Sequence, residues 1–254
     1  TNMPWVLEEA ALSDALGGVP VKLLNDLEAV ACGVLRLPDE AFCELNGGRA
    51  VKGNQVVIAA GTGLGEALLH WDGAGHTAIA SEGGHCDFAP VDAMQDGLLL
   101  FLRGRFGGHV SYERILSGSG LYLVYQYLLA CGAGRSNPQV AQALLSCNDP
   151  AAVIARFGLE LGDAGCRQAL ALLARIYGQE AGNLALKCLA RGGVLLAGGI
   201  APKLLPVLKE GCFMDGFCDK GRFAALLRDL PVRVCLDPCA PLLGAAAMSA
   251  ALLA

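Results

Sequence analysis

The chain has 254 residues, of which 54% are hydrophobic and 17% are charged, and its formal net charge is −5. A chain of this length and composition folds as one large or two modest globular domains and is not disordered. The acidic balance and the lack of any run of basic residues argue against nucleic acid as the main partner.

The sequence indicates neither a membrane protein nor a secreted one. Its longest largely apolar run, residues 242–254, is shorter than the roughly 20 residues that a membrane-spanning helix needs. No charged leader followed by an apolar block opens the chain. The 11 cysteines are scattered and form no Cys-x-x-Cys pair, so we expect reduced thiols, no metal centre and a cytoplasmic location.

The first part of the chain predicts a helix, a short strand and a second helix. Apolar residues recur at helical spacing over residues 5–16 and 27–35, and residues 19–24 form a mostly apolar run typical of a buried strand. Asp26 then stands where the strand gives way to the helix. Two interpretations of Asp26 are open: an N-cap, or a carboxylate at the ligand-binding edge of a parallel sheet.

A glycine-rich turn joins the next two predicted strands. Residues 55–60 and 67–71 are apolar runs, and residues 61–65 read Gly-Thr-Gly-Leu-Gly. The pattern predicts a hairpin, not the strand-to-helix turn of a dinucleotide fold. Such a turn can cradle phosphate oxygens through its N–H groups, although tight hairpins also use glycine for conformation alone.

The segment that follows, residues 81–90, places Glu82 and His85 on either side of Gly83 and Gly84. Two adjacent glycines let the backbone turn sharply and aim both side chains into one small space. A carboxylate and an imidazole together offer acceptors and a donor, which suits a ligand rich in hydroxyl groups. The alternative is an ordinary surface turn.

The rest of the chain alternates helices with two further strands, which indicates α/β layers. Glu113 precedes a long apolar helix and has the plain explanation of a first-turn acid. Gly198 and Gly199 close a predicted strand, where glycine permits close approach of a flat ligand. The predicted helices are residues 91–106, 121–129, 138–147, 151–157, 164–190, 202 onward and 241 onward, and the strands are 192–200 and 232–236.

Taken together and in this order, the motifs resemble those of the bacterial ATP-dependent glucokinase family, within the sugar kinase/actin/Hsp70 superfamily. The matching segments cover the chain from end to end. They are residues 24–27, 61–65, 82–90, 108–118, 197–202, 219–223 and 242–244.

The resemblance implies an α/β fold of two ribonuclease-H-like (actin-like ATPase) domains with a cleft between them. Residues 1–37 plus 232–254 would form the remainder of a small domain, incomplete at its N-terminus, and residues 38–231 a large one. It implies a glucokinase that transfers a phosphoryl group from ATP, with Mg²⁺, to the 6-hydroxyl of glucose. A homodimer, and the alternative of a sugar-binding regulator or non-catalytic remnant, stay open.

Residue by residue, the resemblance implies that Asp26 is the catalytic base. The other implied roles are glucose binding by Asn25, Glu82, His85 and Glu113, and ATP binding by Gly61, Thr62, Gly63, Gly198 and Gly199. No residue is implied as a metal ligand.

The sequence departs from the family in two places. Ala59-Ala60 precedes the Gly-Thr-Gly turn where the family often has another glycine. The cysteine-rich zinc motif of related kinases and repressors is missing, which favours the glucokinase branch. The family's first phosphate motif, an Asp followed by Gly-Gly-Thr, is also missing, and the chain begins with Thr1. We therefore expect a fragment that lacks the opening strands of the first domain.

Overall fold

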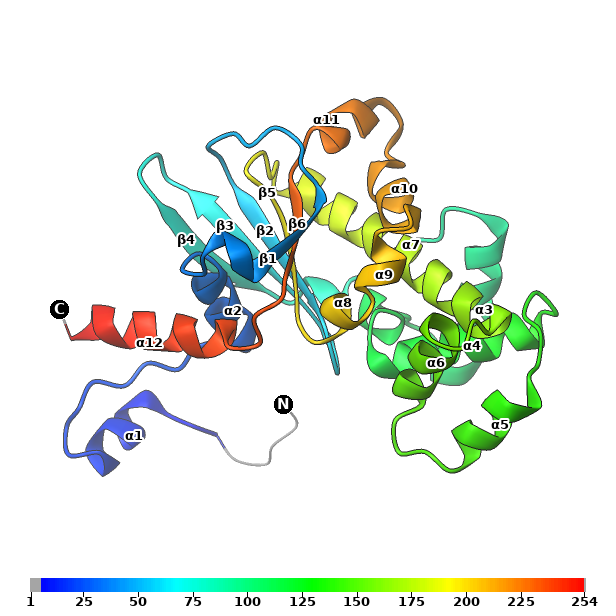
Figure 1. Ribbon diagram of the computed structural model, residues 1–254. Helices are drawn as coiled ribbons and strands as arrows, with labels where there is room; N and C mark the ends of the chain where they lie inside the picture. The colour runs from blue at the N-terminus through cyan, green and yellow to red at the C-terminus, as the bar shows by residue number, and fades with distance from the viewer. Residues whose placement is uncertain (1–5, 254) are drawn as a thin grey trace.

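A computed structural model describes residues 6–253, which are built around one mixed sheet of six strands (Figure 1). The strand order is β1-β6-β5-β2-β3-β4. The strands are β1 (Phe42–Asn46), β2 (Gln55–Ala60), β3 (Leu64–Trp71), β4 (His76–Ser81), β5 (Gly193–Ala197) and β6 (Val232–Cys235). Parallel pairing joins β2 to β5 and β5 to β6, whereas the other neighbours are antiparallel.

The central strands are buried on both faces of the sheet. Every residue of β5 is buried, and in β2 every residue after Gln55 is buried. Continuous apolar runs of this kind are typical of parallel strands covered by helices on both sides. Because β2 and β5 are parallel, their C-terminal ends, where the two glycine segments begin, lie next to each other at the same end of the sheet.

On one face, the sheet packs against the larger hydrophobic core, through which the long helix α7 (Ala164–Lys187) runs. The other helices of this part are α3 (Ala93–Phe106), α4 (Gly118–Ala130), α5 (Pro138–Leu145), α6 (Pro150–Leu159), α8 (Ile200–Lys203), α9 (Leu205–Leu208), α10 (Cys212–Cys218) and α11 (Ala224–Arg228). A short helix, α1 (Glu9–Ala15), precedes the sheet in the chain and buries none of its residues.

On the other face lie α2 (Asp26–Val34) and α12 (Ala240–Leu252), side by side although they come from opposite ends of the chain (Figure 1). A side chain at Gly33 would collide with the backbone of Ala240, and one at Gly244 with the backbone of Ala29. The two helices therefore touch backbone to backbone, which only glycine permits. A second hydrophobic cluster, which includes Ala31, joins this pair to the sheet.

The predicted helices and the predicted hairpin are confirmed, with boundaries shifted by a few residues, but the predicted strand at residues 19–24 is wrong. Val19 is 50% exposed, Leu23 is 39% exposed, and the segment pairs with no strand among the described residues. The N–H of Leu23 instead donates to the Glu9 carboxylate, 2.9 Å away. An apolar run forms a β-strand only when a neighbouring strand is available to pair with it. The predicted first helix began at residue 5, which lies outside the described residues.

Two strands were not predicted: β1 and β4. Both lie at the edges of the sheet, each paired with a single neighbour. Their sequences, Phe-Cys-Glu-Leu-Asn and His-Thr-Ala-Ile-Ala-Ser, contain no fully buried residue. The apolar signal that reveals a central strand is therefore weak in both.

One boundary of the expected domain division is wrong. Strand β6 was assigned to the smaller domain, yet it is hydrogen-bonded between β1 and β5 within the sheet. A boundary at residue 232 would cut a buried strand from both neighbours. The remaining part of the division, in which α2 and α12 belong to the smaller domain, stays a prediction.

Candidate active site

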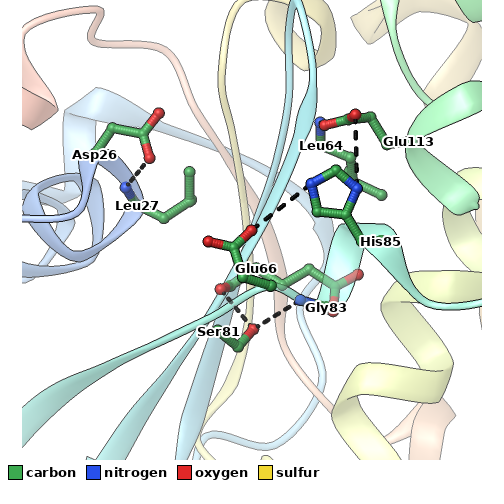
Figure 2. Close-up of polar contacts among 9 residues, drawn as sticks. Asp26, Leu27, Leu64, Glu66, Ser81, Gly83, His85 and Glu113 are labelled. Atoms are coloured by element: carbon green, nitrogen blue, oxygen red, sulfur yellow. Dashed lines mark hydrogen bonds and ion pairs between the residues drawn. The ribbon is translucent and has the colours of Figure 1, made fainter. Parts of the chain in front are cut away.

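Three parts of the chain meet at the end of the β2–β3 hairpin: strand β3, the loop after β4 that carries His85, and the segment that carries Glu113 (Figure 2). The His85 ring lies between two carboxylates: Nε2 is 3.8 Å from Glu82 Oε2, and Nδ1 is 3.9 Å from Glu113 Oε1. The pairing of β3 with β4 places the His85 loop beside β3, because Ser81 at the end of β4 lies opposite Glu66 of β3. The expected convergence of Glu82, His85 and Glu113 is present in the structure.

The third segment is joined to the histidine loop by backbone hydrogen bonds. The N–H of Tyr112 donates to the Cys86 carbonyl over 3.1 Å, and the N–H of Phe88 donates to the Val110 carbonyl over 2.9 Å. These bonds hold the segment that carries Glu113 alongside the segment that carries His85.

Gly83 and Gly84 are required by close approach. Both have ordinary φ values, since neither belongs to the positive-φ residues. A side chain at Gly84 would strike the Leu64 carbonyl, and one at Gly83 would strike the Glu66 carboxyl group. The glycine pair therefore lets the loop lie directly on β3, where it forms a single 3₁₀ turn over residues Gly83–His85.

Glu113 is held by the glycine-rich turn itself. Its Oε2 accepts a hydrogen bond from the N–H of Leu64 over 3.1 Å, and its side chain is 29% exposed. A side chain at Gly63 would strike this carboxylate. The first-turn explanation of Glu113 is wrong, because α4 begins at Gly118 and its N-cap is Ser117. Glu113 instead joins the histidine cluster to the turn.

Asn25, and not Asp26, caps α2. Its side-chain oxygen accepts from the N–H of Leu27 over 2.9 Å and from that of Glu28 over 3.3 Å. Asp26 is the first residue of the helix and is exposed; one of its oxygens, Oδ1, accepts from Leu27 N over 2.8 Å. The cap interpretation of Asp26 is therefore wrong, and its second oxygen has no hydrogen-bond partner among the described residues.

The start of α2 is held close to the hairpin. The Leu27 side chain lies where a side chain at Gly65 would have to be, so β3 and α2 meet at this point. Figure 2 shows Asp26 on the α2 side and the His85–Glu113 pair on the other side, with Leu64 of the hairpin beside the pair.

A cavity of about 760 Å³ opens at the same turn. Its walls include the expected residues Gly61, Thr62 and Gly199, and its apolar lining includes Leu121, Tyr122, Ala151, Ala155, Ile200 and Leu204. The cavity does not include the other two residues expected near ATP. Gly63 faces Glu113, while Gly198, at φ +78°, lies against the Ala60 carbonyl.

The sequence did not assign a role to three further residues that line this cavity: Gly118, Ser119 and Lys203. Gly118 and Ser119 form the first turn of α4, and the Gly118 N–H donates to the Gly61 carbonyl over 3.0 Å. The N-terminus of a helix attracts anions through its free N–H groups and its dipole. The run Ser-Gly-Ser-Gly at 117–120 was the available signal for this helix start.

Across residues 6–253 no three His, Cys, Asp or Glu side chains are grouped closely enough to hold a metal ion, and no helix is long and apolar enough to cross a membrane. Mg²⁺ bound with a nucleotide needs no such group, since it keeps several waters and takes most ligands from phosphates and one or two carboxylates. The exposed Thr62 hydroxyl, which lines the cavity, is compatible with that mode.

The solved structures similar to this chain include sugar kinases of the actin-like ATPase class. A glucokinase from an Antarctic psychrotroph is 28% identical, with a TM-score of 0.81 over 95% of this chain and 72% of that one. A glucokinase from Balamuthia mandrillaris, solved in complex with glucose, is 25% identical, with a TM-score of 0.76 over 90% of this chain and 65% of that one.

The sequence comparisons narrow the class to one family. The glucokinase family model matches residues 1–252. The glucokinase of Synechocystis sp. is 38% identical over 263 aligned positions, which cover 98% of this chain and 74% of that protein. The chain belongs to the glucokinase family. The prediction from its motifs that it is an ATP-dependent hexose kinase is confirmed.

Proposed function

We propose that the end of the β2–β3 hairpin is where this glucokinase joins its two substrates, with glucose on the histidine side and ATP in the cavity. The observation that carries the proposal is the position of the turn. Leu64 donates to the Glu113 carboxylate, and two residues earlier in the same turn, Thr62 lines the cavity. A phosphoryl group that leaves the cavity at Thr62 would thus meet a sugar held by Glu113.

Glucose is the ligand that the histidine side fits best. Glu82 and Glu113 each place a carboxylate oxygen within 4 Å of a ring nitrogen of His85. Hydrogen bonds from hydroxyls to charged groups are worth about 1.5–3 kcal/mol each, so a few of them discriminate strongly among sugars. Glucose is bound by the related Balamuthia mandrillaris glucokinase, which supports this assignment.

Asp26 serves as the catalytic base in this proposal. The attacking 6-hydroxyl must lose its proton, and a carboxylate within hydrogen-bond reach accepts it. The exposed second oxygen of Asp26 is available for that purpose, since the first one is occupied by Leu27 N. Because Asn25 uses its oxygen to cap α2, its side-chain NH₂ group is left to donate to the sugar.

ATP occupies the cavity with its base against the apolar walls and its phosphates toward Thr62 and the first turn of α4. Leu121, Tyr122 and Ile200 supply flat apolar surface. The α4 N-terminus and Lys203 supply favourable charge for the phosphates. When bound, Mg²⁺ neutralises charge that develops on the transferred phosphoryl group.

The decisive experiment pairs turnover with binding. Glucose 6-phosphate formation is followed by a coupled assay with glucose and ATP, and glucose binding is measured separately by calorimetry. We expect the parent protein to form glucose 6-phosphate and to bind glucose. We expect Asp26→Asn to lose turnover while it keeps glucose binding. Glucose binding without turnover in the parent protein would favour the alternative of a sugar-binding regulator. The homodimer and the cytoplasmic location stay predictions.

A further inference from the structure

A pair of buried carboxyl groups lies directly beneath the sugar-binding segments and has no part in the mechanism above. Glu66 of β3 is 1% exposed, and Glu180 of α7 is fully buried. Burial of two acids side by side is costly unless their charge is compensated. Their position therefore calls for an explanation.

Glu66 supports the histidine loop. Its carboxyl group occupies the space into which a side chain at Gly83 would project, so the backbone of Gly83 rests directly on it. On the other side of Gly83, Ser81 Oγ accepts from the Gly83 N–H over 3.2 Å and donates to the Glu66 carbonyl over 2.9 Å (Figure 2). The loop segment between Glu82 and His85 is thus fixed to Glu66 through Gly83.

Glu180 supports the other sugar-binding segment. Its Oε2 accepts from Asn183 Nδ2 over 2.9 Å, and the same amide donates to the Tyr112 hydroxyl over 3.1 Å. Tyr112 directly precedes Glu113. The Lys187 ammonium lies 3.5 Å from Glu180 Oε1. Through Asn183, the position of Glu180 is therefore coupled to that of Glu113.

The two acids differ in their hydrogen-bond and ion-pair partners. Glu180 has Asn183 and Lys187, with Lys220 also nearby, whereas Glu66 Oε1 has no hydrogen-bond partner among the described residues. Burial, followed by the neighbouring charge of Glu180, raises the pKa of Glu66 to about 8. Glu66 is accordingly protonated at neutral pH.

The remaining titratable groups around the pair are few. They are Tyr112 of the Glu113 segment, Tyr177 and Lys187 of α7, Cys188 at the end of α7, and Lys220. Burial raises the pKa of Tyr112, of Tyr177 and of Cys188, away from neutrality, and lowers the pKa of Lys220, so Lys220 is the other group near the pair whose pKa is moved toward neutrality.

We propose that Glu66 and Glu180 are positioning residues for glucose, and that the pair keeps the histidine loop and Glu113 in their binding geometry. Ionisation of Glu66 buries a charge with no partner, which draws water in or moves the group toward solvent. The covering layer that gives way is the Gly83 backbone. Glucose binding then weakens, while the cavity proposed for ATP is left as it was. The inference rests on the proposed glucose site.

The test measures the KM for glucose and for ATP between pH 7.5 and 9.5, a range in which ordinary histidines are already neutral. The glucose KM of the parent protein is expected to rise by about fivefold or more, with the ATP KM changing by less than about twofold. Glu66→Gln keeps the shape and cannot ionise. Its glucose KM should match that of the parent at pH 7.5 and stay flat as the pH rises.

Two further variants make the result specific. Glu180→Gln removes the neighbouring carboxyl group that helps to raise the pKa of Glu66, so it should move the rise in glucose KM to lower pH, a result that does not depend on Glu66→Gln folding well. Cys188→Ser removes the thiol near Glu66 and should leave the rise intact. A rise that persists in Glu66→Gln, stays at the same pH in Glu180→Gln, disappears with Cys188→Ser, or affects ATP as strongly as glucose overturns the proposal. If the parent shows no turnover, the proposed function fails, and the same pH comparison is made by calorimetry with glucose alone.

Discussion

The Glu113 carboxylate accepts a hydrogen bond from the backbone N–H of Leu64 over 3.1 Å. This single bond connects a side chain of the proposed sugar site to the turn that lines the proposed ATP cavity. A change at Glu113 therefore has two separable consequences, because the carboxylate has one oxygen on Leu64 and another that faces His85.

Glu113→Gln is expected to raise the glucose KM by about 10-fold to 100-fold, equivalent to a lost charged hydrogen bond of about 1.5–3 kcal/mol. Its amide oxygen can still accept from Leu64, so the ATP KM should change little. Glu113→Ala loses both interactions and should raise both constants. Steady-state kinetics with each substrate varied in turn separates the two. Equal effects of the two variants on ATP would contradict the anchoring role of Glu113.

Asp26→Asn is expected to lower kcat by at least about 10², with little change in the glucose KM, because an amide cannot accept the proton. Glu28→Gln, in the same first turn of α2, is the matched control and should keep its activity. Asn25→Ala should instead lower stability by about 1 kcal/mol through the lost cap. Near-normal kcat in Asp26→Asn would remove Asp26 from the mechanism.

Gly84→Ala is expected to weaken glucose binding and lower the melting temperature, because its methyl group meets the Leu64 carbonyl, which is part of the β3 backbone and cannot turn aside. Overpacking of this kind costs about 1–3 kcal/mol. Gly75→Ala, in the β3–β4 turn, is the control, since open space surrounds that position. Thermal melts with and without glucose compare the two. Parent-like behaviour of Gly84→Ala would refute the close-approach account.

Stability should depend on pH through Glu66. Its folded-state pKa, about 8, lies above the ordinary value of 4.5, so the folded protein holds a proton that the unfolded chain releases. Its contribution is complete below pH 4.5 and is lost as the pH rises through 8. Glu66→Gln has no such dependence. Its melting temperature, relative to the parent, should therefore rise steadily from pH 5 to pH 8, and a constant difference would contradict the raised pKa.

The hairpin and the histidine loop were predictable because glycine marks them locally. The hydrogen bonds that join distant segments of the site were not predictable. The bond between Leu64 and Glu113 joins residues 49 positions apart, and the glycines that permit it have no distinctive spacing. Edge strands β1 and β4 were missed because neither contains a fully buried residue, so their pairing with β6 and β3 and not local hydrophobicity defines them. The run at residues 19–24, which pairs with no strand among the described residues, misled the prediction because pairing is not visible in a local pattern.

The pairing of glutamates 66 and 180 was likewise invisible in the sequence. Each looks like an ordinary polar residue in an amphipathic element, on a strand and on a helix respectively. Only the packing of α7 against the sheet brings them together and buries them. Burial of charge is a property of tertiary structure, and a local pattern does not reveal it.

The contact between Gly33 of α2 and Gly244 of α12 has a mechanical consequence. Side-chain packing has some play, because rotamers adjust; two backbones in direct contact have very little. Asp26 begins the helix that is held in this way, so the position of its carboxylate is tied through the backbone of α2 to that of α12.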